Sequence, residues 1–232
     1  MPRFTSYIST SLPRNFVVAA RVLPFALYIA FLAAGPLIAE ALPDSDARWL
    51  YAWQIGAVLL ALLAFRRVYV ELRTPLLNWR SAAIALAIGA LVFVLWINLD
   101  LPWLTLGEAK GYDPTRVDGS LNWALIAVRI FGAAAVVPVM EELFWRSLIL
   151  RWIERSDFLA ISPQAVSLRA LLISSVIFGL EHQLWIAGIL AGLAYGWLYR
   201  KFGSLWLSIF AHAVTNLLLG LWVVQTGSWR FW

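Results

Sequence analysis

Residues 140–146 read Met-Glu-Glu-Leu-Phe-Trp-Arg and place two adjacent carboxylates and an arginine directly after an apolar run, residues 124–139. That run is apolar enough to lie in lipid. An ionised side chain near the centre of a bilayer costs at least ~2.5–3.5 kcal/mol on insertion scales. Such groups persist where they face the interior of a helix bundle, pair with another group or take part in chemistry. The fold must therefore be one that shields Glu141, Glu142 and Arg146.

The composition of the whole chain indicates a membrane protein. Of its 232 residues, 62% are hydrophobic and 13% are charged, against about 45–50% and about 25% in soluble domains. The absence of cysteine excludes disulfides, thiolate metal sites and cysteine nucleophiles. The net charge of +5 lies mainly on arginines in short segments between apolar runs, which reports membrane topology and not nucleic-acid binding. We predict an all-α, polytopic transmembrane helix bundle, with residues 1–232 as a single membrane domain.

The apolar runs predict about seven spans, within a range of six to eight. The first run also resembles a signal peptide, but its long polar leader, its two prolines and the spans that follow favour a retained span. Some later runs are shorter than the ~20 residues that a perpendicular helix needs. The predicted spans are 22–39, 49–65, 82–99, a run from 121 to the glutamate pair, 170–179, 184–199 and 205–224.

Charges in the connecting segments predict the orientation. Basic residues fill the links after spans two, four and six, whereas the links after spans one and three are acidic or neutral. Because basic links stay in the cytoplasm, seven spans give a cytoplasmic N-terminus and an extracytoplasmic C-terminus. The basic residues are Arg66, Arg67, Arg73, Arg80, Arg146, Arg151, Arg155, Arg169, Arg200 and Lys201, and the acidic ones are Glu40, Asp44, Asp46, Asp100, Glu108, Asp113 and Asp118.

Three glycines recur at four-residue intervals in the sixth span, at Gly188, Gly192 and Gly196. On a helix they share one face, where a neighbouring backbone can approach closely. This pattern predicts helix packing and carries no sign of a ligand.

The chain has two histidines, His182 and His212, and both lie at or inside apolar runs. An ionisable residue in a membrane segment is a functional hypothesis by default. Phe178 and Asn216 stand four residues from them, so on helices an aromatic ring lies beside His182 and a carboxamide shares the face of His212.

Glu142 and Arg146 are also four residues apart, in the order that favours an intrahelical ion pair. Glu141 then points about 100° away around the helix and is left free to act. Pro138 has no N–H, so the carbonyl of Ala134 loses its helical partner there. The sequence thus assigns Glu142 to structure and Glu141 to chemistry.

The depth of these groups can be counted from the nearest basic residues. At ~1.5 Å per residue, Glu141, His212 and His182 lie about 8, 16 and 20 Å from the cytoplasmic interface. One cavity can hold all three only if the helices tilt or His182 lies shallower.

A free carboxylate, two imidazoles and a carboxamide in a dry cavity suit hydrolysis by an activated water. Glu141 and His182 would hold and deprotonate the water, while His212 and Asn216 would donate to the oxygen that gains charge. A zinc version would take Glu141, His182 and His212 as ligands. No His-Glu-x-x-His motif occurs, so we predict no metal or other cofactor. The remaining Glu181 and Arg129 are predicted to form a buried structural ion pair.

In chain order, Glu141-Glu142-x-x-x-Arg146, Phe178-x-x-x-His182 and His212-x-x-x-Asn216 resemble the three motifs of the CAAX protease and bacteriocin-processing (CPBP/Abi) family. Its members are intramembrane glutamic endopeptidases, and the resemblance covers residues 122–221. It implies a cavity that opens toward the cytoplasm. It also implies Glu141 as the base, His182 as its partner, His212 and Asn216 as the oxyanion site, and Glu142, Arg146 and Phe178 as supporting residues.

We therefore predict an intramembrane endopeptidase whose N-terminal spans, 1–120, precede a catalytic core, 121–224. Its partners would be the bilayer and a peptide or membrane-associated protein substrate, with no nucleic acid. The N-terminal third resembles the CAAX-protease-related proteins of bacterial exosortase systems, which implies a bacterial inner membrane. The alternatives are a non-catalytic immunity or scaffold protein of the same fold, a zinc-dependent protease and a proton-coupled transporter. The sequence leaves the oligomeric state open.

Overall fold

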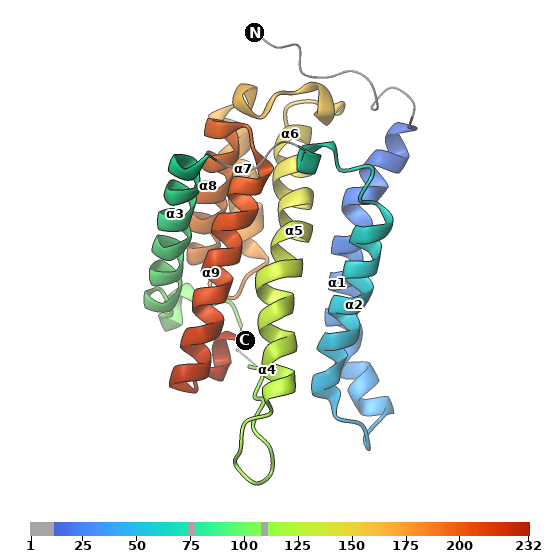
Figure 1. The fold of residues 1–232 in the computed structure, drawn as a ribbon, viewed down its shortest axis with the longest axis vertical. Coiled ribbons are helices and arrows are strands. Elements are labelled where there is room, and N and C mark those ends of the chain that lie inside the picture. Colours follow the sequence, from blue (N-terminus) through green and yellow to red (C-terminus); the bar gives the residue numbers. More distant parts are fainter. Residues whose placement is uncertain (1–11, 74–77, 108–110) are drawn as a thin grey trace.

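The computed structural model describes residues 12–73, 78–107 and 111–232, so Glu108 of the acidic link lies outside the described residues. Seven helical segments follow one another in the predicted order, and the described residues form no β-strand (Figure 1). The all-α bundle is therefore confirmed. The helices are α1 (Arg14–Ala41), α2 (Leu50–Ala64), α3 (Trp79–Asn98), a continuous helix Trp123–Trp152, α7 (Leu168–Leu180), α8 (Trp185–Phe202) and α9 (Leu205–Thr226). Short turns in the links are η1 (Ala47–Trp49), η2 (Val70–Arg73), η3 (Pro102–Leu104), η6 (Phe158–Ala160), η7 (Pro163–Ala165) and η8 (Trp229–Phe231).

Within the described ranges, five helices are long and apolar enough to cross a membrane: Arg14–Ala41, Ala47–Ala64, Trp79–Asn98, Trp123–Trp152 and Leu205–Thr226. The fifth and sixth predicted spans correspond to α7 and α8, which are not among these five helices. Helix α7 has 13 residues, fewer than the ~20 needed to cross the hydrocarbon core. It pairs with α8 as a hairpin: one face of α7, with Ser175 and Gly179, packs on α8, and the other face is apolar and exposed.

The helix that carries the glutamate pair is longer than the sequence predicts. Two π-helical segments, η4 (Gly132–Val136) and η5 (Leu143–Ile149), join α4 (Trp123–Phe131), α5 (Val137–Glu142) and α6 (Leu150–Trp152) into one rod. Arg146 lies inside this rod and is 3% exposed, so it was the wrong marker for the membrane interface. Counted from the helix end at Trp152, Glu141 lies about 16 Å deep. This depth matches the value expected for His212 and removes the conflict between them.

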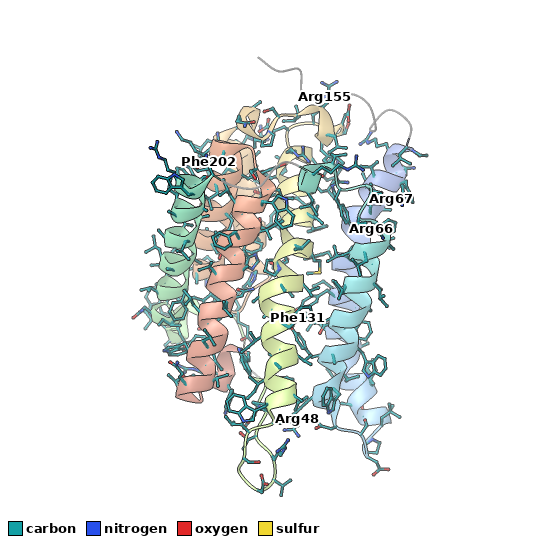
Figure 2. All side chains as sticks on the ribbon, in the orientation of Figure 1. Arg48, Arg66, Arg67, Phe131, Arg155 and Phe202 are labelled. Atoms are coloured by element: carbon teal, nitrogen blue, oxygen red, sulfur yellow. The ribbon has the colours of Figure 1, made fainter. Side chains whose placement is uncertain are left out.

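The basic links gather at one end of the bundle (Figure 2). Arg66, Arg67 and Arg155 lie there, whereas Arg48 lies at the opposite end. We name these the basic end and the acidic end; the acidic end carries the described acidic link residues Glu40, Asp44, Asp46, Asp100, Asp113 and Asp118. The positive-inside rule assigns the basic end to the cytoplasm.

Close helix contacts hold α9 at the centre of the core. Gly203, at φ +69°, makes the tight turn from α8 into α9, so these two helices run antiparallel. A Cβ on Gly89 of α3 would lie 2.4 Å from the Ala211 carbonyl of α9. The glycine face of α8 packs on α7 as predicted, since a Cβ on Gly192 would lie 2.9 Å from the Ser175 Cα. Figure 1 shows α3, α8 and α9 on one side of α4–α6 and the α1–α2 pair on the other.

A buried ion cluster that the sequence did not predict closes the basic end. Glu71 of η2 lies 2.6 Å from Arg21 of α1 and 2.6 Å from Arg151 of α6, and it also accepts a hydrogen bond from Ser147. Burial alone would raise the pKa of Glu71, but the two arginine charges and the Ser147 hydrogen bond outweigh it and lower the pKa to about 2. Arg21 and Arg151 are 1% and 4% exposed. Both are interior groups, and for Arg151 this differs from its predicted place in a basic link.

Candidate active site

The adjacent glutamates of α5 have different partners. The Oε2 atom of Glu142 lies 3.1 Å from Arg146 Nε, which confirms the predicted pair. Its Oε1 atom lies 3.0 Å from His212 Nδ1, a contact that the sequence did not predict. Glu141 Oε2 is buried without a hydrogen-bond partner among the described residues and lies 4.0 Å from His212 Nε2. The Oε2 atoms of both glutamates are buried without a hydrogen bond, but that of Glu142 lies in an ion pair with Arg146, so Glu141 is the less engaged carboxylate.

His182 is held in one tautomer by the end of α7. Its Nδ1 atom lies 2.7 Å from the carbonyl oxygen of Phe178, and because a carbonyl only accepts, Nδ1 must carry the proton. The ring also packs on Phe178 at 4.7 Å, as predicted, and meets Trp96 edge-to-face at 5.4 Å. Nε2 of a neutral His182 is therefore left as a hydrogen-bond acceptor.

His212 is oriented by α8 and by Glu142. The Tyr195 ring stacks on the imidazole at 5.0 Å with an interplanar angle of 18°, and the Tyr195 hydroxyl donates to Thr215 at 2.7 Å. With Nδ1 directed at Glu142, Nε2 turns toward Glu141. Sequence reasoning missed Tyr195; the only signal was its place next to Gly196 on the packed face of α8.

Asn216 lies one turn beyond His212 and is tied to the interrupted helix. Its Nδ2 donates to the carbonyl of Ala133 at 2.8 Å. In the π-helical register of η4, Val137 N–H bonds to Gly132, five residues back, so the donor missing at Pro138 leaves the carbonyl of Ala133 open. The expectation that Ala134 would be the open carbonyl was wrong by one residue, because a proline in an α-helical register was assumed.

The predicted ion pair between Glu181 and Arg129 is wrong. Glu181 accepts a hydrogen bond from Trp145 Nε1 at 3.2 Å. Arg129 lies instead over the ring of Tyr51, at 4.2 Å. The turn after α7 brings Glu181 into the active-site group along with its neighbour His182, which residue spacing along α7 alone did not reveal.

Ligand atoms of Glu141, Glu181 and His182 lie within 4.8 Å of one another. These three side chains are the group in the described part of the chain that could hold a metal ion. The set differs from the predicted zinc ligands, since His212 is replaced by Glu181 and bonds to Glu142 instead. Two carboxylates and one imidazole with an unpartnered buried oxygen are a donor set that fits zinc.

All four predicted catalytic residues line one cavity of about 210 Å³. The cavity extends from Glu141 toward the acidic end, where Tyr51, Trp96 and Trp232 line it. A second cavity of about 240 Å³ shares Trp96, His182, Phe231 and Trp232 with the first and reaches Asp100 and Arg230 in the links of the acidic end.

The cavity extends toward the acidic end, whereas the family resemblance implies an opening toward the cytoplasm, to which the positive-inside rule assigns the basic end. Between Glu141 and the basic end, the interior of the bundle is filled by buried side chains, among them Leu143, Arg146 and Leu150. Tyr199 of α8, 1% exposed, packs in the same core. The described residues therefore connect the active-site group to the acidic end and seal it from the basic end.

A comparison with known families is consistent with this group of residues. The family model for Type II CAAX prenyl endopeptidase Rce1-like proteins matches residues 122–218. This range contains all three motifs, from Glu141 to Asn216. No curated protein and no solved structure gave a significant match to the chain.

Proposed function

Because residues 122–218 match the family model for Type II CAAX prenyl endopeptidase Rce1-like proteins, we propose that the chain is a glutamic intramembrane endopeptidase that uses an activated water. The family and the apolar helices identify a CAAX-type protease embedded in a membrane. The observation that carries the glutamic mechanism is the free Oε2 of Glu141 beside two histidines in one cavity. Its substrate is a peptide or a membrane-associated protein.

Glu141 and His182 form the water-binding side of the site. Both present acceptors, the free carboxylate oxygen and the Nε2 that the Phe178 hydrogen bond leaves unprotonated. A water that donates one hydrogen to each turns its lone pair toward the substrate carbonyl. Water-bridged acceptors stand about 4.5 Å apart at normal hydrogen-bond lengths, which agrees with ligand atoms within 4.8 Å. Glu141 then takes the proton as the water attacks and passes it to the leaving amine.

His212 and Asn216 form the opposite side, where the carbonyl oxygen becomes an oxyanion. Asn216 has a second amide hydrogen besides the one given to Ala133. His212 donates from Nε2 when it is protonated, because its Nδ1–H is given to Glu142. Preorganised donors of this kind typically contribute about 10²–10³ in kcat.

The zinc-dependent version is a second candidate because Glu141, Glu181 and His182 form a suitable donor set. These three residues would hold the ion, which would supply an activated water and polarise the peptide carbonyl. His212 and Asn216 keep the same role in either version. Cleavage that survives exhaustive chelation excludes the zinc version, whereas loss on chelation with recovery on zinc addition excludes the metal-free one.

The substrate reaches the site from the acidic end. The cavity extends in that direction and is closed by packed side chains in the other. With the basic end in the cytoplasm, the cleaved bond belongs to a segment that enters from the extracytoplasmic half of the bilayer.

Glu141→Gln is the direct test of the proposed function. The substitution removes the base but preserves the size of the side chain, so cleavage should be lost while insertion and melting stay as in the wild type. Proteomic comparison of membranes that carry either form should reveal a protein whose cleaved product is absent in the variant. Near-wild-type cleavage by Glu141→Gln would exclude Glu141 as the base.

A further inference from the structure

Arg129 is a half-buried arginine on the wall of the catalytic cavity, and it forms no ion pair with a carboxylate among the described residues. Its guanidinium lies between two tyrosine rings, 4.2 Å from the Tyr51 centroid and 5.1 Å from that of Tyr112. Within the described ranges, no carboxylate lies close enough to pair with it. By contrast Arg21, Arg146 and Arg151 each contact a glutamate. Tyrosine faces stabilise a guanidinium but leave its edge N–H groups unused.

Arg129 also belongs to the wall of the catalytic cavity. Arg129, Ala133, Val137 and Glu141 all line it. They recur every four residues and so form one continuous stripe along the helix Trp123–Trp152. The stripe has a free cation at one end, a free carboxylate at the other and two small or branched apolar side chains between them.

Resting on the function proposed above, we infer that Arg129 binds a carboxylate of the peptide substrate and so sets which bond lies at Glu141. Guanidinium groups bind carboxylates bidentately, and such pairs are strong where water is scarce. The residues between the bound carboxylate and the cleaved bond lie along Ala133 and Val137 and are therefore apolar. The ligand class is an apolar peptide that ends in, or contains near its end, one carboxylate.

The length of the stripe gives a register. Arg129 and Glu141 are twelve residues apart, which is about 18 Å along a helix. An extended peptide advances about 3.3–3.6 Å per residue, so about five residues fill the distance. The carboxylate is either the C-terminal group of the substrate or an acidic side chain at that position.

The test is a binding measurement that needs no cleavage. Glu141→Gln protein in nanodiscs is titrated with a dye-labelled octapeptide of alternating alanine and leucine, in three forms: free acid, C-terminal amide, and amide with glutamate at the penultimate position. We expect the free acid to bind about tenfold or more tightly than the plain amide, the effect of one charge-assisted bidentate pair. Arg129→Gln should reduce this ratio to about one. Arg116→Gln, at an exposed arginine of the same end that does not line the cavity, should leave it unchanged.

Each outcome decides the inference. Tighter binding of the glutamate-containing amide than of the plain amide, lost in Arg129→Gln, supports the site with an acidic side chain as the source. Equal binding of acid and amide by the Arg129-containing protein, no binding of either, or a ratio that persists in Arg129→Gln overturns it. If Arg129→Gln does not fold, Arg129→Lys replaces it: the ratio should fall but stay above one, and an unchanged ratio overturns the inference. Absent proteolysis with a carboxylate preference intact would refute the proposed function alone.

Discussion

The two buried carboxylates Glu71 and Glu141 lie in the same bundle and differ in how completely they are paired. Both oxygens of Glu71 lie 2.6 Å from an arginine, and Ser147 also donates to one of them. Glu141 keeps one oxygen that is buried and has no hydrogen-bond partner within the described residues, with His212 Nε2 4.0 Å away. The first arrangement stabilises the ionised group in place, and the second leaves it able to accept a proton.

The two ends of the bundle also differ, in how completely side chains fill them. The basic end is closed by packed side chains around the Glu71 cluster, while the acidic end is hollowed by two adjoining cavities. A membrane protein that must admit water and a peptide to a buried site needs one end that resists opening. We interpret the basic end, which the Glu71 cluster holds together, as the end that stays closed. Glu141 and Arg129 line the cavity that extends from there toward the acidic end.

The largest expected effect is on stability, from Glu71→Gln. The change leaves Arg21 and Arg151 buried without their anion, and breaking a buried pair in this way costs about 3–5 kcal/mol. The melting temperature in detergent should fall markedly, whereas Glu141→Gln, which removes a carboxylate without a partner, should not lower it. Equal melting of the two variants would show that the cluster does not hold the basic end.

A second test of the Glu71 cluster is to measure the melting temperature of the wild type and of Glu71→Gln as the pH is lowered. The folded-state pKa of Glu71, about 2, lies below its ordinary value of 4.5. A depressed pKa contributes stability that is complete above about pH 4.5 and is lost as the pH falls toward 2. The wild type should therefore lose melting temperature across this window more steeply than Glu71→Gln, and parallel curves would contradict the assignment.

A smaller effect, confined to turnover, is expected from His212→Ala and Asn216→Ala. Each removes one donor to the oxyanion and should lower kcat by about 10²–10³ with little change in KM. The assay uses the substrate that the Glu141→Gln comparison identifies. Leu217→Ala is the control, since its side chain is 41% exposed on the same helix. A rise in KM with unchanged kcat would assign these residues to substrate binding.

Residue spacing predicted the contacts that lie within one helix. The pairs Glu142–Arg146 and Phe178–His182 followed from four-residue intervals, because neighbours on a helix face are fixed by its geometry. The apolar runs likewise predicted the order of the seven helices in the described residues, although α7, with 13 residues, is too short to cross the hydrocarbon core by itself.

Residue spacing could not predict contacts between segments that lie far apart in the sequence. Glu71 meets Arg21 and Arg151 across 50 and 80 residues, and no local pattern marks such pairs. Glu181 was assigned to a structural pair because its position depends on the turn after α7. The direction of the cavity depends on how side chains fill the two ends, so it could not be read from charge alone.

The direction of the cavity can be tested because the chain contains no cysteine. Single cysteines are placed at Leu219, which lines the cavity, at Asp118 in a link of the acidic end and at Arg155 at the basic end. A membrane-impermeant maleimide added to intact cells should label Asp118→Cys and, more slowly, Leu219→Cys. Arg155→Cys should react only after the membrane is permeabilised. Asp118 and Arg155 do not line the cavity, so activity should change little in those two variants.

The three positions separate orientation from access. Labelling of Arg155→Cys alone in intact cells would reverse the orientation that the arginines predict, while Leu219→Cys would still react with the same side as Asp118→Cys. Labelling of Leu219→Cys from the side of Arg155→Cys would instead show that the cavity opens at the basic end. In that case the Glu71 cluster would have to separate for substrate to enter, and Glu71→Gln would accelerate the labelling of Leu219→Cys. If the cluster is the closed end, that variant leaves the side of labelling unchanged.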